Sequence, residues 1–87
     1  SVDPMLTFDQ IFAAHDSLTL DDTTGMWHMK CPDEATARDV AAKLNLSCEP
    51  KENYTGLWFR EFGKNALVGS YDKHEKRLWI YATAWEH

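Results

Sequence analysis

Two segments of the chain repeat their apolar residues at the spacing of an α-helix. In residues 7–18, TFDQIFAAHDSL, the stripe begins behind a capping box formed by Thr7 and Gln10. In residues 32–45, PDEATARDVAAKLN, proline sets the first turn, acidic residues follow it, and alanine, valine and leucine repeat on one side. The pattern predicts a short helix that ends near Asp16 and a second helix that ends before Asn45, a residue that tolerates the left-handed cap.

The second half of the chain alternates apolar and polar residues, which is typical of strands. Three runs, LWFREF, ALVGSY and RLWIYATAW, occupy residues 57–62, 66–71 and 77–85, with turn-forming residues between them. They predict a three-stranded antiparallel meander. A shorter hairpin is expected around the turn sequence DDTTG of residues 21–25, whereas residues 47–56, SCEPKENYTG, are interpreted as a long loop.

Together these elements predict one α+β domain over residues 1–87, with two helices packed on an antiparallel sheet that ends in the three-stranded C-terminal meander. A chain of this length is large enough for one small core. Residues 1–4, SVDP, precede Met5 and are interpreted as a leftover of an expression vector.

The last predicted strand is apolar on both sides, which raises the question of what covers its second face. A two-residue turn between the first two strands of the meander would pair odd positions with even ones. This register places Trp58 in the core under the helices. It places four aromatic residues on the opposite face: Phe59, Trp79, Tyr81 and Trp85. Aromatic residues inside a polar rim are typical of an interface. Three alternatives would explain this second face: a helix that covers it as a second core, a free binding surface, or a homodimer contact.

Composition adds an acidic charge to this picture. Apolar residues make up 44% of the chain and aromatic residues 13%, as in a folded domain, and the net charge is −5. Residues 1–52 hold ten acids and four bases, whereas residues 53–87 hold four acids and five bases. An acidic half repels phosphate and attracts a basic protein surface. The acids expected to contact such a partner lie on the second helix and its neighbouring loops: Asp21, Asp22, Asp33, Glu34 and Asp39.

The best candidates for a catalytic or metal-binding site in this sequence are histidine and cysteine residues. His28 and Cys31 form one pair and Cys48 stands alone, whereas a structural zinc ion needs four such ligands. Cys31 precedes a helix start, where the dipole favours a thiolate, but on an alternating strand it points away from His28. We therefore expect no metal, no cofactor and no catalytic residues, and whether the two cysteines pair is left open.

These observations favour a small acidic, non-enzymatic binding protein that blocks a basic, nucleic-acid-binding protein, as inhibitors, immunity proteins and phage or plasmid counter-defence factors do. One alternative is a single-stranded nucleic-acid-binding module that stacks bases on the aromatic sheet face, although the net charge disfavours nucleic acid. The other is a small metal or thiol protein built on its cysteine and histidine residues. The chain has no signal-like segment and no apolar run of about 18 residues, so we expect a cytoplasmic protein without a membrane partner.

Overall fold

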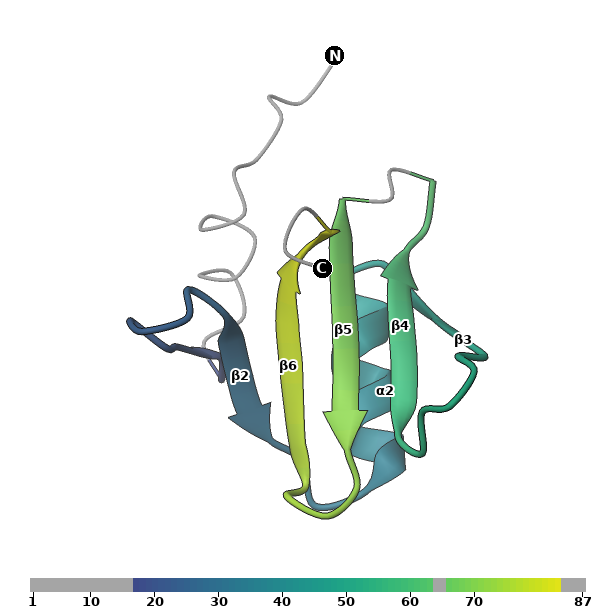
Figure 1. Ribbon diagram of the computed structural model, residues 1–87, viewed down its shortest axis with the longest axis horizontal. Coiled ribbons are helices and arrows are strands. Elements are labelled where there is room, and N and C mark those ends of the chain that lie inside the picture. Colours follow the sequence, from purple (N-terminus) through teal and green to yellow (C-terminus); the bar gives the residue numbers. More distant parts are fainter. Residues whose placement is uncertain (1–16, 64–65, 84–87) are drawn as a thin grey trace.

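The computed structural model describes residues 17–63 and 66–83, which form a six-stranded sheet with one helix packed against it (Figure 1). Neighbouring strands are all antiparallel, and their order across the sheet is β1-β2-β6-β5-β4-β3. In Figure 1 the helix lies behind the sheet, so the sheet face toward the viewer is the one opposite the helix. The elements in chain order are β1 (Thr19–Leu20), β2 (Trp27–Lys30), α2 (Glu34–Lys43), β3 (Leu46–Glu49), β4 (Leu57–Glu61), β5 (Leu67–Asp72) and β6 (Arg77–Ala82).

The predicted arrangement of two helices on a sheet that ends in a three-stranded meander is wrong. The described residues hold a single short helix and are mostly sheet. Strands β4, β5 and β6 pair consecutively as expected, but they lie inside a six-stranded sheet, with β3 beside β4 and β2 beside β6. The predicted hairpin is present as β1 and β2. The helix expected over residues 7–16 lies outside the described residues.

Helix α2 begins and ends for reasons that the sequence contains. Asp33 is its N-cap, and Asp33 Oδ1 accepts hydrogen bonds from the backbone N–H and from the hydroxyl of Thr36, each at 2.8 Å. These two bonds hold the pKa of the Asp33 carboxyl below its usual value. The buried side of the helix carries Ala37, Val40 and Ala41. Asn45 follows the helix in the left-handed conformation, with φ of 62°, which confirms its predicted role.

The sequence pattern does not reveal strand β3. It has only four residues, LSCE, and Leu46 alone is buried, so no apolar alternation marks it. Asn45 reverses the chain directly into this strand, and its carbonyl oxygen accepts a hydrogen bond from the N–H of Phe62 at 3.0 Å. The long loop therefore begins at Pro50 and spans residues 50–56.

The core lies between α2 and the sheet face that this helix covers. Burial alternates along β6, where Leu78 and Ile80 are fully buried and Trp79 between them is half-buried. The shared feature of the core residues is an apolar side chain directed into this layer. They are Leu18, Cys31, Ala37, Val40, Ala41, Leu44, Leu46, Leu57, Phe59, Leu67, Tyr71, Leu78 and Ile80.

The register between β4 and β5 differs from the predicted one and exchanges the two faces of β4. Leu57 pairs with Tyr71 and Phe59 pairs with Gly69, so odd positions lie opposite odd positions. Residues 62–66 connect the strands, whereas the prediction assumed a two-residue turn. Since a one-residue slip moves every side chain of a strand to the other face, Trp58 leaves the core and Phe59 enters it.

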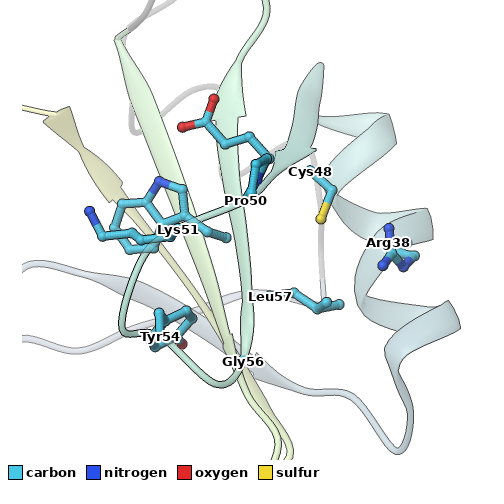
Figure 2. Close-up of a pocket in the computed structure, with 9 residues that line it drawn as sticks. Arg38, Cys48, Pro50, Lys51, Tyr54, Gly56 and Leu57 are labelled. Carbon is cyan, nitrogen blue, oxygen red and sulfur yellow. The ribbon is translucent and has the colours of Figure 1, made fainter.

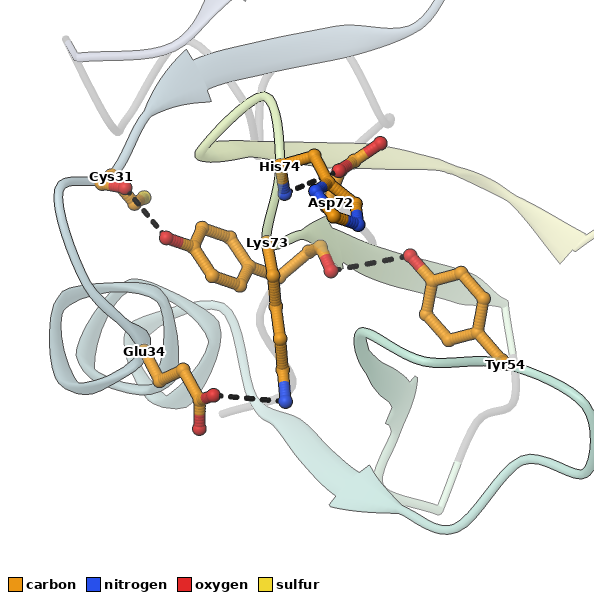
Figure 3. Close-up of polar contacts among 7 residues, drawn as sticks. Cys31, Glu34, Tyr54, Asp72, Lys73 and His74 are labelled. Atoms are coloured by element: carbon orange, nitrogen blue, oxygen red, sulfur yellow. Dashed lines mark hydrogen bonds and ion pairs between the residues drawn. The ribbon is translucent and has the colours of Figure 1, made fainter.

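Hydrogen bonds and an ion pair tie the turn between β5 and β6 to the start of α2 (Figure 3). The buried Tyr71 hydroxyl donates to the carbonyl oxygen of Cys31 at 2.7 Å, and Lys73 Nζ lies 3.1 Å from Glu34 Oε1. The Tyr54 hydroxyl reaches over from the 50–56 loop and donates to the carbonyl oxygen of Tyr71 at 3.2 Å. Burial raises the pKa of both tyrosine hydroxyls.

Candidate functional site

The acidic residues expected to bind a partner do not form one cluster. Asp21 and Asp22 lie in the turn between β1 and β2, before strand β2 begins. Asp33 and Glu34 follow the other end of the same strand. The four residues of β2 span roughly 13 Å at about 3.3 Å per residue, so the two acidic pairs flank opposite ends of this strand.

Most of these acids have a contact within the fold. Asp21 Oδ1 accepts two backbone N–H hydrogen bonds inside its own turn, at 2.9 and 3.4 Å. Asp33 caps α2, and Glu34 forms the ion pair with Lys73. Asp39 is exposed on the helix. Three of the five acids, Asp21, Asp33 and Glu34, therefore have local structural roles.

The four aromatic residues assigned to an interface have different positions. Phe59 is 1% exposed and belongs to the core, so its assignment to the binding surface was wrong. The cause is the five-residue connection after β4, which shifts the pairing by one position. Trp79 and Tyr81 lie on the face opposite the helix, as predicted. Trp85 lies outside the described residues.

Among residues 17–63 and 66–83, the sheet face opposite α2 carries Trp58, Trp79 and Tyr81, and we call it the aromatic face. Trp58 and Tyr81 come from different strands, and their ring centroids are 6.4 Å apart with the edge of one ring against the other. Tyr54 also contacts Trp58 in an edge-to-face arrangement, with ring centroids 5.9 Å apart. The sequence analysis placed Trp58 in the core and did not assign it to this face. A connection with an odd number of residues after β4 would have predicted its position here.

Charged groups surround the rings of the aromatic face. The Arg77 guanidinium lies 2.7 Å from His28 Nδ1, and the His28 ring contacts Trp79 with a centroid distance of 4.7 Å. Lys51 Nζ lies 4.3 Å above the Trp58 ring, a cation–π contact. The Trp58 ring is only 7% exposed beneath it, whereas Trp79 and Tyr81 are partly exposed. This face therefore presents two partly exposed aromatic rings held between charged neighbours.

The cysteine and histidine candidates are not brought together. Cys31 is fully buried in the core, while His28 lies on the aromatic face, so the opposition of faces expected from strand alternation is confirmed. Burial is the main reason that the pKa of the Cys31 thiol is raised, and the nearby Asp33 charge raises it further. Both cysteines are free, and Cys48 is exposed. Within residues 17–63 and 66–83, no three His, Cys, Asp or Glu side chains are grouped as metal ligands.

Comparisons of the chain with models of protein families, with curated proteins and with solved structures find no match. None of the helical structure described here has the length and apolar character needed to cross a bilayer.

Proposed function

We propose that the chain is a non-enzymatic binding domain that contacts a basic partner protein through the aromatic face. The observation that carries this proposal is the placement of Trp79 and Tyr81. They are two positions apart on β6, so their side chains lie on the same face of the sheet. Both side chains are partly exposed and bounded by charged residues. Tryptophan, tyrosine and arginine are the residue types that dominate binding energy at protein interfaces.

The structure of this face supports a preorganised contact. The Trp79 ring lies against His28, and Tyr81 lies against Trp58. Side chains that are already held in place lose little conformational entropy when a partner binds. The net charge of −5 favours approach of a basic protein at long range, while the aromatic rings supply short-range contact.

The mode of action that we propose is occupation of a functional surface of that partner, as an inhibitor, immunity-type protein or counter-defence factor would do. A small rigid sheet with aromatic anchors is suited to such blocking. The acidic residues predicted to bind the partner are distributed over separate turns and the helix. They therefore attract the basic partner at long range and do not form the contact itself.

The test is affinity capture from extracts of the organism that encodes the chain, read by quantitative mass spectrometry. Three immobilised proteins are compared: the native chain, Trp79→Ser with Tyr81→Ser, and Lys43→Gln on the exposed side of α2 as a control outside the proposed contact. We expect a basic protein that the native chain and the helix control retain and the sheet variant loses. Equal retention by all three would refute the proposed surface, and a folded sheet variant is verified by circular dichroism.

Single-stranded nucleic acid is the second candidate, favoured by the cations near the rings of the aromatic face. These are Lys30, Lys51, Arg60 and Arg77. Aromatic rings and cations on one sheet face are the elements with which several modules bind single strands. Titration of tryptophan fluorescence with oligothymidylate tests it: quenching that saturates and weakens steeply with salt supports this candidate, and an unchanged signal excludes it in favour of a protein partner.

A further inference from the structure

Arg77 occupies the centre of a row of charged side chains on the aromatic face. It pairs directly with Lys30 of β2 on one side and with Asp72 of β5 on the other. Directly paired residues of an antiparallel sheet have Cβ atoms about 5 Å apart, so Asp72 is within reach of the guanidinium. In the structure the guanidinium instead lies 2.7 Å from Nδ1 of His28, and among the described residues it forms no ion pair. Arg77 therefore has two acceptors within reach and contacts one of them.

The contact with Arg77 defines the protonation state of His28. A guanidinium is always protonated and has only donors, so Nδ1 of His28 accepts the hydrogen bond through its lone pair. The imidazole is then neutral and carries its proton on Nε2. A proton added at Nδ1 would remove the acceptor and place two cations 2.7 Å apart. Protonation of His28 and its contact with Arg77 therefore exclude each other.

The His28 ring also packs on Trp79. The two residues are directly paired across β2 and β6, and their ring centroids are 4.7 Å apart with an angle of 37° between the planes. Histidine is the side chain that ordinarily changes its charge between about pH 5 and pH 8. A proton taken up by His28 therefore places a positive charge directly beside one of the two partly exposed rings of the aromatic face.

The charged groups around His28 come from its own strand and from the elements beside it. Thr19, which pairs with His28 from β1, does not titrate. The titratable and charged groups on these elements are Lys30 on β2, Asp21 and Asp22 in the turn between β1 and β2, Arg77 and Tyr81 on β6, and Asp72 beyond Arg77 on β5. Lys51, which lies over Trp58 of β4 (Figure 2), is separated from β2 by β5 and β6. Among the described residues, Arg77 is thus the charged group that contacts the His28 ring.

Asp72 is the second acceptor for Arg77 and stays ionised while a histidine titrates. Its Oδ1 accepts hydrogen bonds from the N–H of Glu75 at 3.1 Å and from the N–H of His74 at 2.8 Å (Figure 3). These backbone bonds hold the pKa of the Asp72 carboxyl below its usual value. A guanidinium released from His28 therefore finds a carboxylate on the neighbouring strand.

From this geometry we infer that His28 and Arg77 form a pH-dependent switch on the aromatic face. Neutral His28 holds Arg77 at its Nδ1. When Nδ1 takes a proton from solvent, Arg77 turns to Asp72 and the imidazolium adds one positive charge beside Trp79. A basic partner should then bind this face more weakly at acidic pH. This regulation rests on the proposed function, whereas the switch itself belongs to the isolated chain.

Nitrogen NMR of the ¹⁵N-labelled native chain tests the switch without any partner. At about pH 8 we expect a pyridine-type signal for Nδ1 of His28 and a pyrrole-type signal for Nε2, as the contact with Arg77 requires. On acidification to about pH 5, the Arg77 side-chain signals and the indole N–H signal of Trp79 should shift with the same midpoint as the His28 ring. A neutral ring with its proton mainly on Nδ1, or Arg77 signals that do not follow His28, would overturn the switch.

His28→Gln is the test variant, because the glutamine carbonyl can accept from Arg77 but takes up no proton in this pH range. His74→Gln, in the exposed turn between β5 and β6, is the matched control. The Trp79 transition should disappear in His28→Gln and persist in His74→Gln. A transition that survives in folded His28→Gln, or one that is lost only in His74→Gln, would assign it to another group and overturn the switch.

The consequence for binding is measured with the basic protein that the native chain captures. Its Kd for the native chain should rise about fivefold or more between about pH 8 and pH 5.5, as one added charge near the contact implies. The same measurement on His28→Gln corrects for titration of the partner and should show a much smaller rise. Equal pH dependence of the two chains would overturn the regulation. Failure to capture any partner would refute the proposed function alone, because the NMR transition of the isolated chain does not depend on it.

Discussion

Replacing Phe59 by alanine should destabilise the fold far more than replacing Trp79 by alanine, although the sequence pattern treats both as members of one aromatic stripe. Phe59 is 1% exposed in the core, and truncation of a buried phenylalanine costs about 3–5 kcal/mol. Trp79 is half-buried, and among the described residues its ring contacts His28 with a centroid distance of 4.7 Å, so its truncation should cost about 1–2 kcal/mol.

Urea unfolding followed by far-ultraviolet circular dichroism measures both values. With an m-value of about 1.5 kcal/mol per molar urea, Phe59→Ala should lower the midpoint by about 2–3 M and Trp79→Ala by about 1 M. An 87-residue domain has a total stability of roughly 4–13 kcal/mol, so Phe59→Leu serves as a milder variant if the alanine variant does not fold. Equal costs at the two positions, or a larger cost at Trp79, would refute the register on which the aromatic face depends.

Three further predictions concern other parts of the fold. Gly56→Ala should lower the melting temperature by 10 °C or so, since an added Cβ would collide with the backbone oxygen of Tyr71; calorimetry showing a native-like transition would contradict this. A colorimetric thiol titration at pH 7.5 should find that Cys48 reacts within minutes and Cys31 only after unfolding, and two fast thiols would disprove the burial of Cys31. Burial raises the pKa of Tyr71, so the stability linked to its neutral hydroxyl is complete below about pH 10, the pKa of an unfolded tyrosine, and is lost as the pH rises further. Tyr71→Phe should therefore flatten the alkaline fall in melting temperature, and an unchanged slope above pH 10 would argue against this role.

The strands with a strong apolar period could be predicted from the sequence, and the shorter ones only where a turn marked them. β6 has a complete alternation from Leu78 to Ala82; it begins at Arg77 as expected and ends at Ala82, before the predicted end at residue 85. The helix was also predicted, and Asn45 follows its end as expected; Pro32, however, was expected in the first turn and instead precedes the N-cap residue Asp33. Strand β3 could not be found, since Leu46 is its only buried residue and its position depends on pairing with β4.

The candidate site could be predicted in part for the same reason. Trp79 and Tyr81 follow from the alternation of their own strand, which no neighbouring turn can change. The faces assigned to Trp58 and Phe59 depended on whether the connection between β4 and β5 has an odd or an even number of residues. The sequence FGKNA allows more than one turn length. The pocket lined by Arg38, Cys48, Tyr54 and Leu57 joins residues of α2, β3, β4 and the 50–56 loop (Figure 2), so no local pattern could indicate it.

The affinity of the captured partner for a set of variants tests the central claim most directly, because it separates the aromatic face from the acidic residues. We predict that Trp79→Ser weakens binding by about 30-fold or more, mainly through faster dissociation, as loss of an interface anchor does. Reversal of charge at Asp22 and Asp39 should lower the association rate and its salt dependence while the dissociation rate stays close to that of the native chain. Native affinity in folded Trp79→Ser, together with loss of binding on charge reversal, would contradict the account and place the contact on the acidic residues.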